Sequence, residues 1–336
     1  MQRPTEFDPN DVARSAQLPL KTIELERVYG CQGVSLSSNI FYTASGKVAY
    51  YVAATGVVMD PETREQSFFV DHTDDITCMA MHPNGRLLVT GQMGVEPHML
   101  VWEDSAMPNS GNLCTPRAVV GYYLPKVAKY ANSKFAGSTQ AWQTNKKMHG
   151  RLPKRPFYHS QISAVAFAGT NGQYLVAAGA DDNHTLAVWN WQSGKLLAQM
   201  PTFKAQPPSL FGIVSNPYVR TPGAIEFVTF GLHHTRFWQF VPKPSKKGAP
   251  GTKPKKAQLL PLKCSYSQEV NRAPKGMLSA VFLPTKSGDG QCLTGGSSGC
   301  VYVWKHGATK PSKGLRDSGD GVFWGLWLCV RCAWCV

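Results

Sequence analysis

The feature that most constrains the fold of this chain is a tryptophan that recurs at the ends of strand-like segments. Four short stretches read apolar–Trp–polar, at residues 101–103, 188–190, 237–239 and 303–305. Their tryptophans are separated by 87, 49 and 66 residues. A four-stranded propeller blade of the WD type repeats every ~40–45 residues. The 49-residue interval fits one blade, and the two longer intervals predict inserts of about 40 and about 20 residues.

Alternation of apolar and polar residues supports this repeat, because a half-buried strand shows a period of two. The alternating segments are separated by the turn dipeptides Asn84-Gly85, Asn171-Gly172, Asp289-Gly290 and Ser298-Gly299. A first unit without tryptophan fits residues 39–70. We therefore predict an all-β, WD-type β-propeller with about five recognisable four-stranded blades and the start of a sixth.

A blade of this type is tied together by a histidine before its first strand and a polar group in the turn before its last. These groups form hydrogen bonds with a strand hydroxyl and with the tryptophan. For the polar group in this turn, the third unit offers Asp181 or Asp182 and the fifth offers Ser298, whereas the fourth has no obvious candidate. We expect a structural rather than a ligand-binding role for the set His72, Trp102, His159, Asp181, Trp189, Trp238 and Trp304.

The net charge of +14 lies in two segments without any acidic residue, and the rest of the chain is nearly neutral. These segments coincide with the two inserts that the spacing predicts, at about 121–158 and 241–257. By blade order, the first insert joins two blades and the second joins the last two strands of the fourth blade, which places them on opposite faces. The candidate partner-binding residues are Lys126, Lys129, Lys146, Lys147, Arg151, Lys154, Arg155, Lys243, Lys246, Lys247, Lys253, Lys255 and Lys256.

The two inserts differ in character. The second is rich in lysine and proline and should be disordered and extended, which suits an acidic protein partner, RNA, anionic lipid, an import receptor or no partner at all. In the first insert, basic residues alternate with aromatic residues, which could stack on nucleotides or dock onto a protein surface. These aromatic residues are Tyr122, Tyr123, Tyr130, Phe135, Trp142, Phe157 and Tyr158.

Several stretches are similar to one known family. Residues 24–33, which read ELERVYGCQG, resemble the core of the HELP motif of the echinoderm microtubule-associated protein-like family. The similarity continues at 71–78, 81–83, 180–191 and 294–299, so that it spans roughly 21–305. The resemblance implies two tandem propellers, of which this chain would hold the first. It also implies binding to tubulin or microtubules without enzymatic activity, and a place in the cytoplasm and cytoskeleton, including the cilium or spindle.

The chain departs from the family pattern at both ends. Residues 1–23 contain no heptads, so we expect no self-oligomerising coiled coil. Residues 317–322 look like the opening of a sixth blade, but 323–336 lose the alternation and are rich in Cys and Trp. We expect a disordered N-terminus at 1–20, the HELP motif and an atypical first blade at 21–70, blades at 71–316, and a truncated or aberrant tail at 317–336.

Candidate catalytic and metal-binding patterns have simpler explanations. The Gly295–Gly299 segment matches a nucleophile elbow, but a strand follows at once where that motif needs a helix. Cys329, Cys332 and Cys335 lack a further ligand pair for zinc. Asn183 heads a glycosylation sequon at the entry to a strand. We expect no enzyme, cofactor or metal, and neither membrane nor nucleic acid as a partner. The function indicated is a scaffold that binds tubulin or microtubules, with a protein-interaction or RNA-associated scaffold as the alternative.

Overall fold

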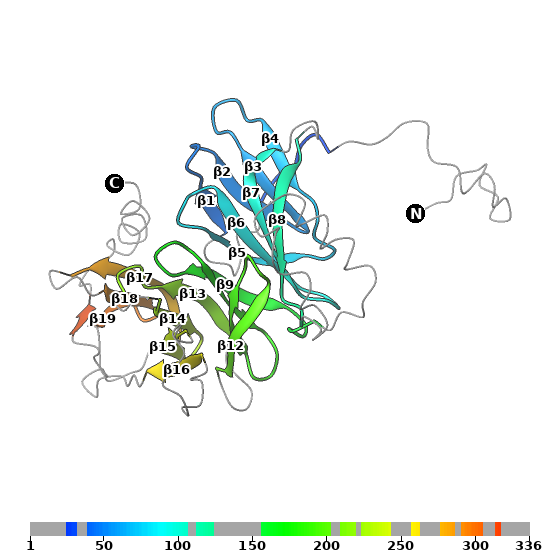
Figure 1. The fold of residues 1–336 in the computed structure, drawn as a ribbon. Helices are drawn as coiled ribbons and strands as arrows, with labels where there is room; N and C mark the ends of the chain where they lie inside the picture. Colours follow the sequence, from blue (N-terminus) through cyan, green and yellow to red (C-terminus); the bar gives the residue numbers. More distant parts are fainter. Residues whose placement is uncertain are drawn as a thin grey trace, which may run out of the picture.

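The computed structural model consists of antiparallel β-strands joined by turns and loops (Figure 1). It describes residues 25–31, 39–106, 112–123, 156–202, 209–219, 223–242, 257–262, 276–285 and 290–304, together with the backbone of 313–316. Within these residues, no helix is long and apolar enough to cross a membrane.

The strands form five four-stranded sheets, and each sheet is a meander of four consecutive strands. Blade 1 contains β1 (Ile40–Tyr42), β2 (Val48–Val52), β3 (Thr55–Met59) and β4 (Gln66–Phe69). Blade 2 contains β5 (Ile76–Met81), β6 (Leu87–Gln92), β7 (Met99–Ala106) and β8 (Cys114–Val120). Blade 3 contains β9 (Ile162–Ala168), β10 (Tyr174–Gly179), β11 (Thr185–Asn190) and β12 (Lys195–Pro201). Blade 4 contains β13 (Leu210–Ser215), β14 (Ile225–Gly231), β15 (His234–Val241) and β16 (Gln258–Leu262). Blade 5 contains β17 (Met277–Pro284), β18 (Gly290–Gly296), β19 (Cys300–Trp304) and β20 (Lys313–Arg316).

The five blades confirm the all-β architecture that the sequence predicts. The outer strand of blade 4 begins at Gln258, after the second insert, as the blade order requires. Blade 5 has a fourth strand, β20, which the alternation did not reveal. The expected sixth blade at 317–322 lies outside the described residues.

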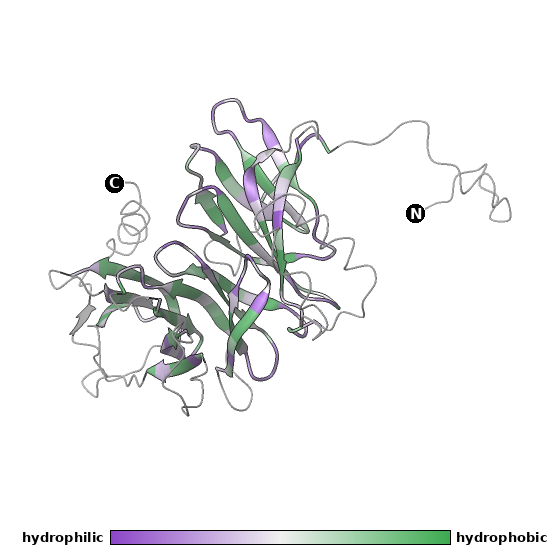
Figure 2. Cartoon of the chain, viewed as in Figure 1, coloured by the Kyte–Doolittle hydropathy of each residue, from purple (hydrophilic) through white to green (hydrophobic). Residues whose placement is uncertain are grey.

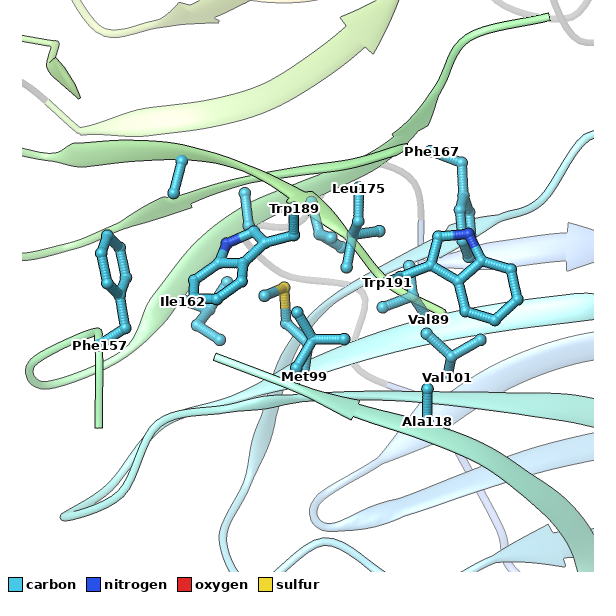
Figure 3. Packing of buried hydrophobic residues seen from close by; sticks show 14 of the residues in the cluster. Val89, Met99, Val101, Ala118, Phe157, Ile162, Phe167, Leu175, Trp189 and Trp191 are labelled. Carbon is cyan, nitrogen blue, oxygen red and sulfur yellow. The ribbon is translucent and has the colours of Figure 1, made fainter. Parts of the chain in front are cut away.

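Each blade packs on the next through one apolar cluster. Between blades 2 and 3, Met99 lies beside Trp189 and Val101 beside Trp191, and all four side chains are buried (Figure 3). Figure 2 colours the described residues by hydropathy, with hydrophobic residues concentrated in the strands and hydrophilic residues in many of the turns. Burial of large apolar side chains between successive sheets is the main favourable contribution to this architecture.

The two ends of the strands define two faces. On face A the second strand of each blade turns into the third, and on face B the first strand turns into the second. Contacts between blades show that the blades point the same way: on face A, Met93 forms a β-bridge with Gln161, and Leu232 with Gly276. On face B, the backbone N–H of Ala44 donates to the carbonyl of Gly85 at 2.7 Å.

The first strands of blades 2 to 5 share one irregularity. Each has a register shift near face A that leaves one residue unpaired, and these residues are Thr77, Ser163, Phe211 and Leu278. Such a β-bulge changes the direction in which a side chain points. In blade 2 the hydroxyl of Thr77 thereby donates to the carbonyl of Ile162 at 2.5 Å, which fastens blade 2 to blade 3.

Candidate interaction surfaces

The tryptophan of blade 2 is tied to its sheet by a buried polar network. The indole N–H of Trp102 donates to the hydroxyl of Thr90 at 3.1 Å, and Nε2 of His72 lies 2.6 Å from the same hydroxyl. Nδ1 of His72 lies 2.8 Å from the amide oxygen of Gln92, so we assign the ring proton to Nδ1. Burial lowers the pKa of His72 to about 3, which keeps it neutral.

Blade 4 makes the same network with a histidine from a different place. Trp238 donates to the hydroxyl of Thr229 at 2.8 Å, and Nε2 of His234 lies 2.7 Å from that hydroxyl. His234 comes from the start of β15, not from the segment before the first strand. Sequence reasoning missed it, although the position of Thr229, nine residues before Trp238, is a usable signal. In blade 5, Trp304 donates to Thr294 at 2.9 Å.

Blade 3 has Ala177 at the position of these threonines, because Ala177 pairs with Ala187, two residues before Trp189. The missing hydroxyl is supplied by Tyr158, which accepts the indole N–H of Trp189 at 3.2 Å and donates to the carbonyl of Ala177 at 3.1 Å. Tyr158 is fully buried. His159, which we expected in this role, is exposed instead.

The remaining predicted residues serve local turns. Asp181 accepts the backbone N–H of Thr185 at 2.7 Å and its hydroxyl at 2.5 Å, which fixes the turn before β11. Asp182 is exposed. Ser298 is also exposed and lies in the turn between β18 and β19, where Gly299 has a φ of +78°. The elbow-like segment is therefore a β-hairpin, and among the described residues no cluster of His, Cys, Asp and Glu could hold a metal.

All thirteen basic residues that the sequence singles out lie outside the described residues, as does the Cys-rich tail. The points where the inserts leave and return are described. Tyr122 and Pro156, at the ends of the first insert, pair in a β-bridge near the β6–β7 connection, on face A. Val241 and Gln258, at the ends of the second insert, pair on face B. The two inserts therefore start from opposite faces, as expected.

Three of the aromatic residues near the first insert belong to the core. Tyr122, Phe157 and Tyr158 are buried, and the ring of Phe157 packs edge-on to Trp189 at 5.1 Å. Tyr123 is 49% exposed. The buried rings are unavailable for stacking on nucleotides, which reduces the set that an RNA-binding role could use.

Face A of blades 1 to 3 carries an excess of acidic residues. Six carboxylates lie in its connections, and among the described residues of these blades no lysine or arginine accompanies them there. The acidic residues are Asp71, Asp74, Asp75, Glu96, Asp181 and Asp182. Face B of the same blades is mixed, since Lys47, Arg64, Arg86 and Lys195 lie there with Asp60, Glu62 and Glu65.

A segment before the first strand is held against blade 1. The side-chain amide of Gln66 accepts the backbone N–H of Val28 at 2.8 Å and donates to the carbonyl of Val28 at 3.0 Å. The same amide donates to the hydroxyl of Tyr50 at 3.0 Å. Val28 also packs on the apolar cluster of Tyr50, Val57 and Phe68. One glutamine thus binds the backbone of this segment as a neighbouring strand would.

Five four-stranded blades, with a tryptophan bonded to a hydroxyl in blades 2 to 5, define a WD-repeat protein of the propeller class. Comparison with family models agrees, because the HELP motif matches residues 18–57 and the WD domain, G-beta repeat, matches residues 63–103. The second match includes β4 of blade 1 and β5 to β7 of blade 2. One sequence repeat therefore spans two blades, and within it Phe69 of blade 1 stacks on Trp102 of blade 2 with ring centroids 4.9 Å apart.

The chain is similar to echinoderm microtubule-associated protein-like proteins. It is 26% identical to echinoderm microtubule-associated protein-like 1 of Rattus norvegicus over 96% of this chain and 32% of that protein. It is 23% identical to the 77 kDa echinoderm microtubule-associated protein of Strongylocentrotus purpuratus, over 96% of this chain and 38% of that protein. The chain thus spans about a third of the length of these relatives.

Two solved structures also match. "Structure of U3-55K" has a TM-score of 0.48 at 13% identity and covers 86% of this chain and 68% of that one. "Crystal structure of RRP9 WD40 repeats" has a TM-score of 0.48 at 13% identity and covers 85% of this chain and 65% of that one.

Proposed function

We propose that this chain is a non-enzymatic scaffold that binds tubulin or microtubules, in the cytoplasm and on the cytoskeleton. The observation that carries the proposal is similarity over 96% of the chain to proteins named as microtubule-associated. The HELP motif ahead of the WD repeat adds to it. The packed blades supply a rigid body, and the basic inserts supply attraction to an acidic protein surface.

The charge distribution favours one insert as the main contact. An acidic partner that approaches face A of blades 1 to 3 meets the carboxylates of Asp74, Asp75 and Glu96, all of which are exposed. Face B carries no such excess in these blades, and the second insert starts there. Lys243, Lys246, Lys247, Lys253, Lys255 and Lys256 are therefore the residues that we propose to face the acidic surface of tubulin.

Co-sedimentation of the full chain with microtubules across a salt series tests the proposal. We expect binding at about 25 mM salt and a loss of affinity on the order of tenfold at about 200 mM, because salt screens exposed charges. A chain in which the six lysines of the second insert are glutamine should bind more weakly at low salt and respond less to salt. No binding at low salt would contradict the proposal.

The alternative is a scaffold associated with RNA through the first insert. Basic residues alternate with Tyr130 and Trp142 in this insert. This favours RNA binding, because aromatic faces stack on unpaired nucleobases. Crosslinking of the purified chain to single-stranded RNA, compared between the native chain and a Tyr130→Ala/Trp142→Ala variant, tests this role. Crosslinking that the double variant leaves unchanged would count against it.

A further inference from the structure

Face A of blade 2 combines exposed apolar side chains with exposed carboxylates. We call this surface the blade 2 patch, and it consists of Asp74, Asp75, Met93, Val95, Glu96 and Tyr123. Val95 is 94% exposed, at the tip of the β6–β7 connection. Tyr123 and Met93 are 49% and 38% exposed. Exposed apolar residues that gather with a polar rim are typical of a protein-binding site.

The patch is assembled from three separate connections. The N–H of Met93 donates to the carbonyl of Asp75 at 3.0 Å, which joins the β6–β7 connection to the β4–β5 connection. The hydroxyl of Tyr122 lies 3.1 Å from Nδ1 of His98 and donates to Glu96 at 3.4 Å. Tyr123 follows Tyr122 in the β8–β9 connection on the same face of blade 2, and its ring lies 5.3 Å from that of Phe157. The apolar and acidic residues therefore form one surface.

Gln92 holds this surface in one conformation. Its side-chain nitrogen donates to the hydroxyl of Thr73 at 2.9 Å, and to the carbonyls of Met93 and Glu96 at 3.4 Å each. Its side-chain oxygen accepts the N–H of Thr73 at 3.3 Å and lies beside buried His72. A surface that is ordered before binding loses less entropy when a partner docks.

We propose that the blade 2 patch binds a basic segment of a partner protein, in which Lys or Arg side chains flank an aliphatic or aromatic side chain. Charge complementarity selects this occupant. The patch presents the carboxylates of Asp74, Asp75 and Glu96, and no described lysine or arginine of blades 1 to 3 lies on face A. The apolar anchor would contact Met93, Val95 and Tyr123. The site takes a partner of opposite charge to the one that the basic inserts attract.

Fluorescence anisotropy with a labelled synthetic peptide tests this site on the full chain. The probe is a peptide of lysine, arginine and leucine, and two control peptides replace leucine by serine or the basic residues by glutamate. We expect binding of the first peptide, weaker binding of the serine version and none of the glutamate version. Binding that is equal for the leucine and serine peptides would overturn the apolar part of the proposal.

Matched variants test whether the peptide binds to the blade 2 patch. Asp75→Asn/Glu96→Gln should weaken peptide binding about three- to tenfold. Glu62→Gln/Glu65→Gln changes the net charge equally but lies on face B, and it should leave binding within about twofold. Val95→Ser should weaken binding, whereas Val241→Ser on face B should not. Thermal unfolding of every variant shows whether it is folded, and equal effects of the two double variants would overturn the proposal.

Two other occupants give distinct results. If this chain's own first insert occupied the patch, neutralising its basic residues would strengthen peptide binding, and the external partner would be excluded. If a second copy occupied it, sedimentation would show a dimer that Asp75→Asn/Glu96→Gln dissociates, and this too would overturn the proposal. A monomer with unchanged or weaker peptide binding after neutralisation supports it.

Discussion

The hydroxyl of Tyr158 accepts the indole N–H of Trp189 at 3.2 Å and takes the place of the strand threonine found in blades 2, 4 and 5. Its donor hydrogen goes to the carbonyl of Ala177. The connection before blade 3 thus supplies a group that the strand lacks, and it ties the end of the first insert to the core.

Removal of this hydroxyl should therefore weaken blade 3. Tyr158→Phe leaves a buried indole N–H without its acceptor, and we expect a loss of about 1–3 kcal/mol in the free energy of unfolding. Urea denaturation of the two variants Tyr158→Phe and His159→Gln measures the effect. The exposed His159 should change stability by less than about 0.5 kcal/mol. A larger loss of stability from His159→Gln than from Tyr158→Phe would show that Tyr158 is not the residue that stabilises Trp189.

Stability should fall as the pH is lowered below neutrality. Burial lowers the pKa of His72 to about 3 and that of His234 to about 4, so the unfolded chain binds more protons than the folded chain below about pH 6.5. Each histidine then contributes a slope of about 1.4 kcal/mol per pH unit between its unfolded and folded pKa.

Urea unfolding at a series of pH values between about 7 and 5 tests this slope. The variant His72→Gln should reduce the slope, whatever it does to the absolute stability. His159→Gln serves as the control because the side chain is exposed. A slope that His72→Gln leaves unchanged would mean that this histidine is not buried as a neutral group.

Gly94 should be intolerant of a side chain. Its φ is +107°, and a Cβ there would lie against the carboxylate of Asp74. Gly299 has a φ of +78° but nothing within 4 Å of its Cβ position. Gly299→Ala should cost about 1–2 kcal/mol in stability from the backbone alone, and Gly94→Ala should cost more. Equal losses in thermal or urea unfolding would contradict the close approach of Asp74.

Gln66 should control how firmly the segment around Val28 is held. Gln66→Leu removes both hydrogen bonds to the Val28 backbone. Faster hydrogen exchange of the Val28 amide and faster tryptic cleavage after Arg27 are expected. Gln258→Leu, at an exposed position of β16, is the control. Protection that survives Gln66→Leu would show that the apolar contacts of Val28 suffice.

The sequence pattern located the blades because two periods coincide in it. Alternation of apolar residues marks the strands, and the tryptophan marks the third strand of blades 2 to 5, so the first three strands of each blade could be placed from the sequence. Strand β20 was not predicted because its residues, Lys313–Arg316, do not show a clear alternation of apolar and polar side chains.

The residues that form hydrogen bonds around the tryptophans were harder to predict, because each is defined by a contact in space and not by a sequence period. Tyr158 and His159 are neighbours, and only the direction in which the chain enters β9 decides which one is buried. His234 reaches the threonine of blade 4 from the third strand, whereas His72 reaches that of blade 2 from the connection before the first strand. The acidic face A is assembled from connections that are far apart in the sequence, so charge counting along the chain could not find it.

We propose that the lysines of the second insert bind the acidic surface of tubulin, and in particular its acidic tails. The most direct measurement is the affinity of four pairings: native chain or a chain with Lys243, Lys246, Lys247, Lys253, Lys255 and Lys256 changed to glutamine, each with microtubules that keep or lack the tails. If the lysines bind the tails, either change alone weakens binding, and both together weaken it little further than one. Losses of affinity that simply add, or binding that neither change reduces, would show that these lysines do not bind the tails.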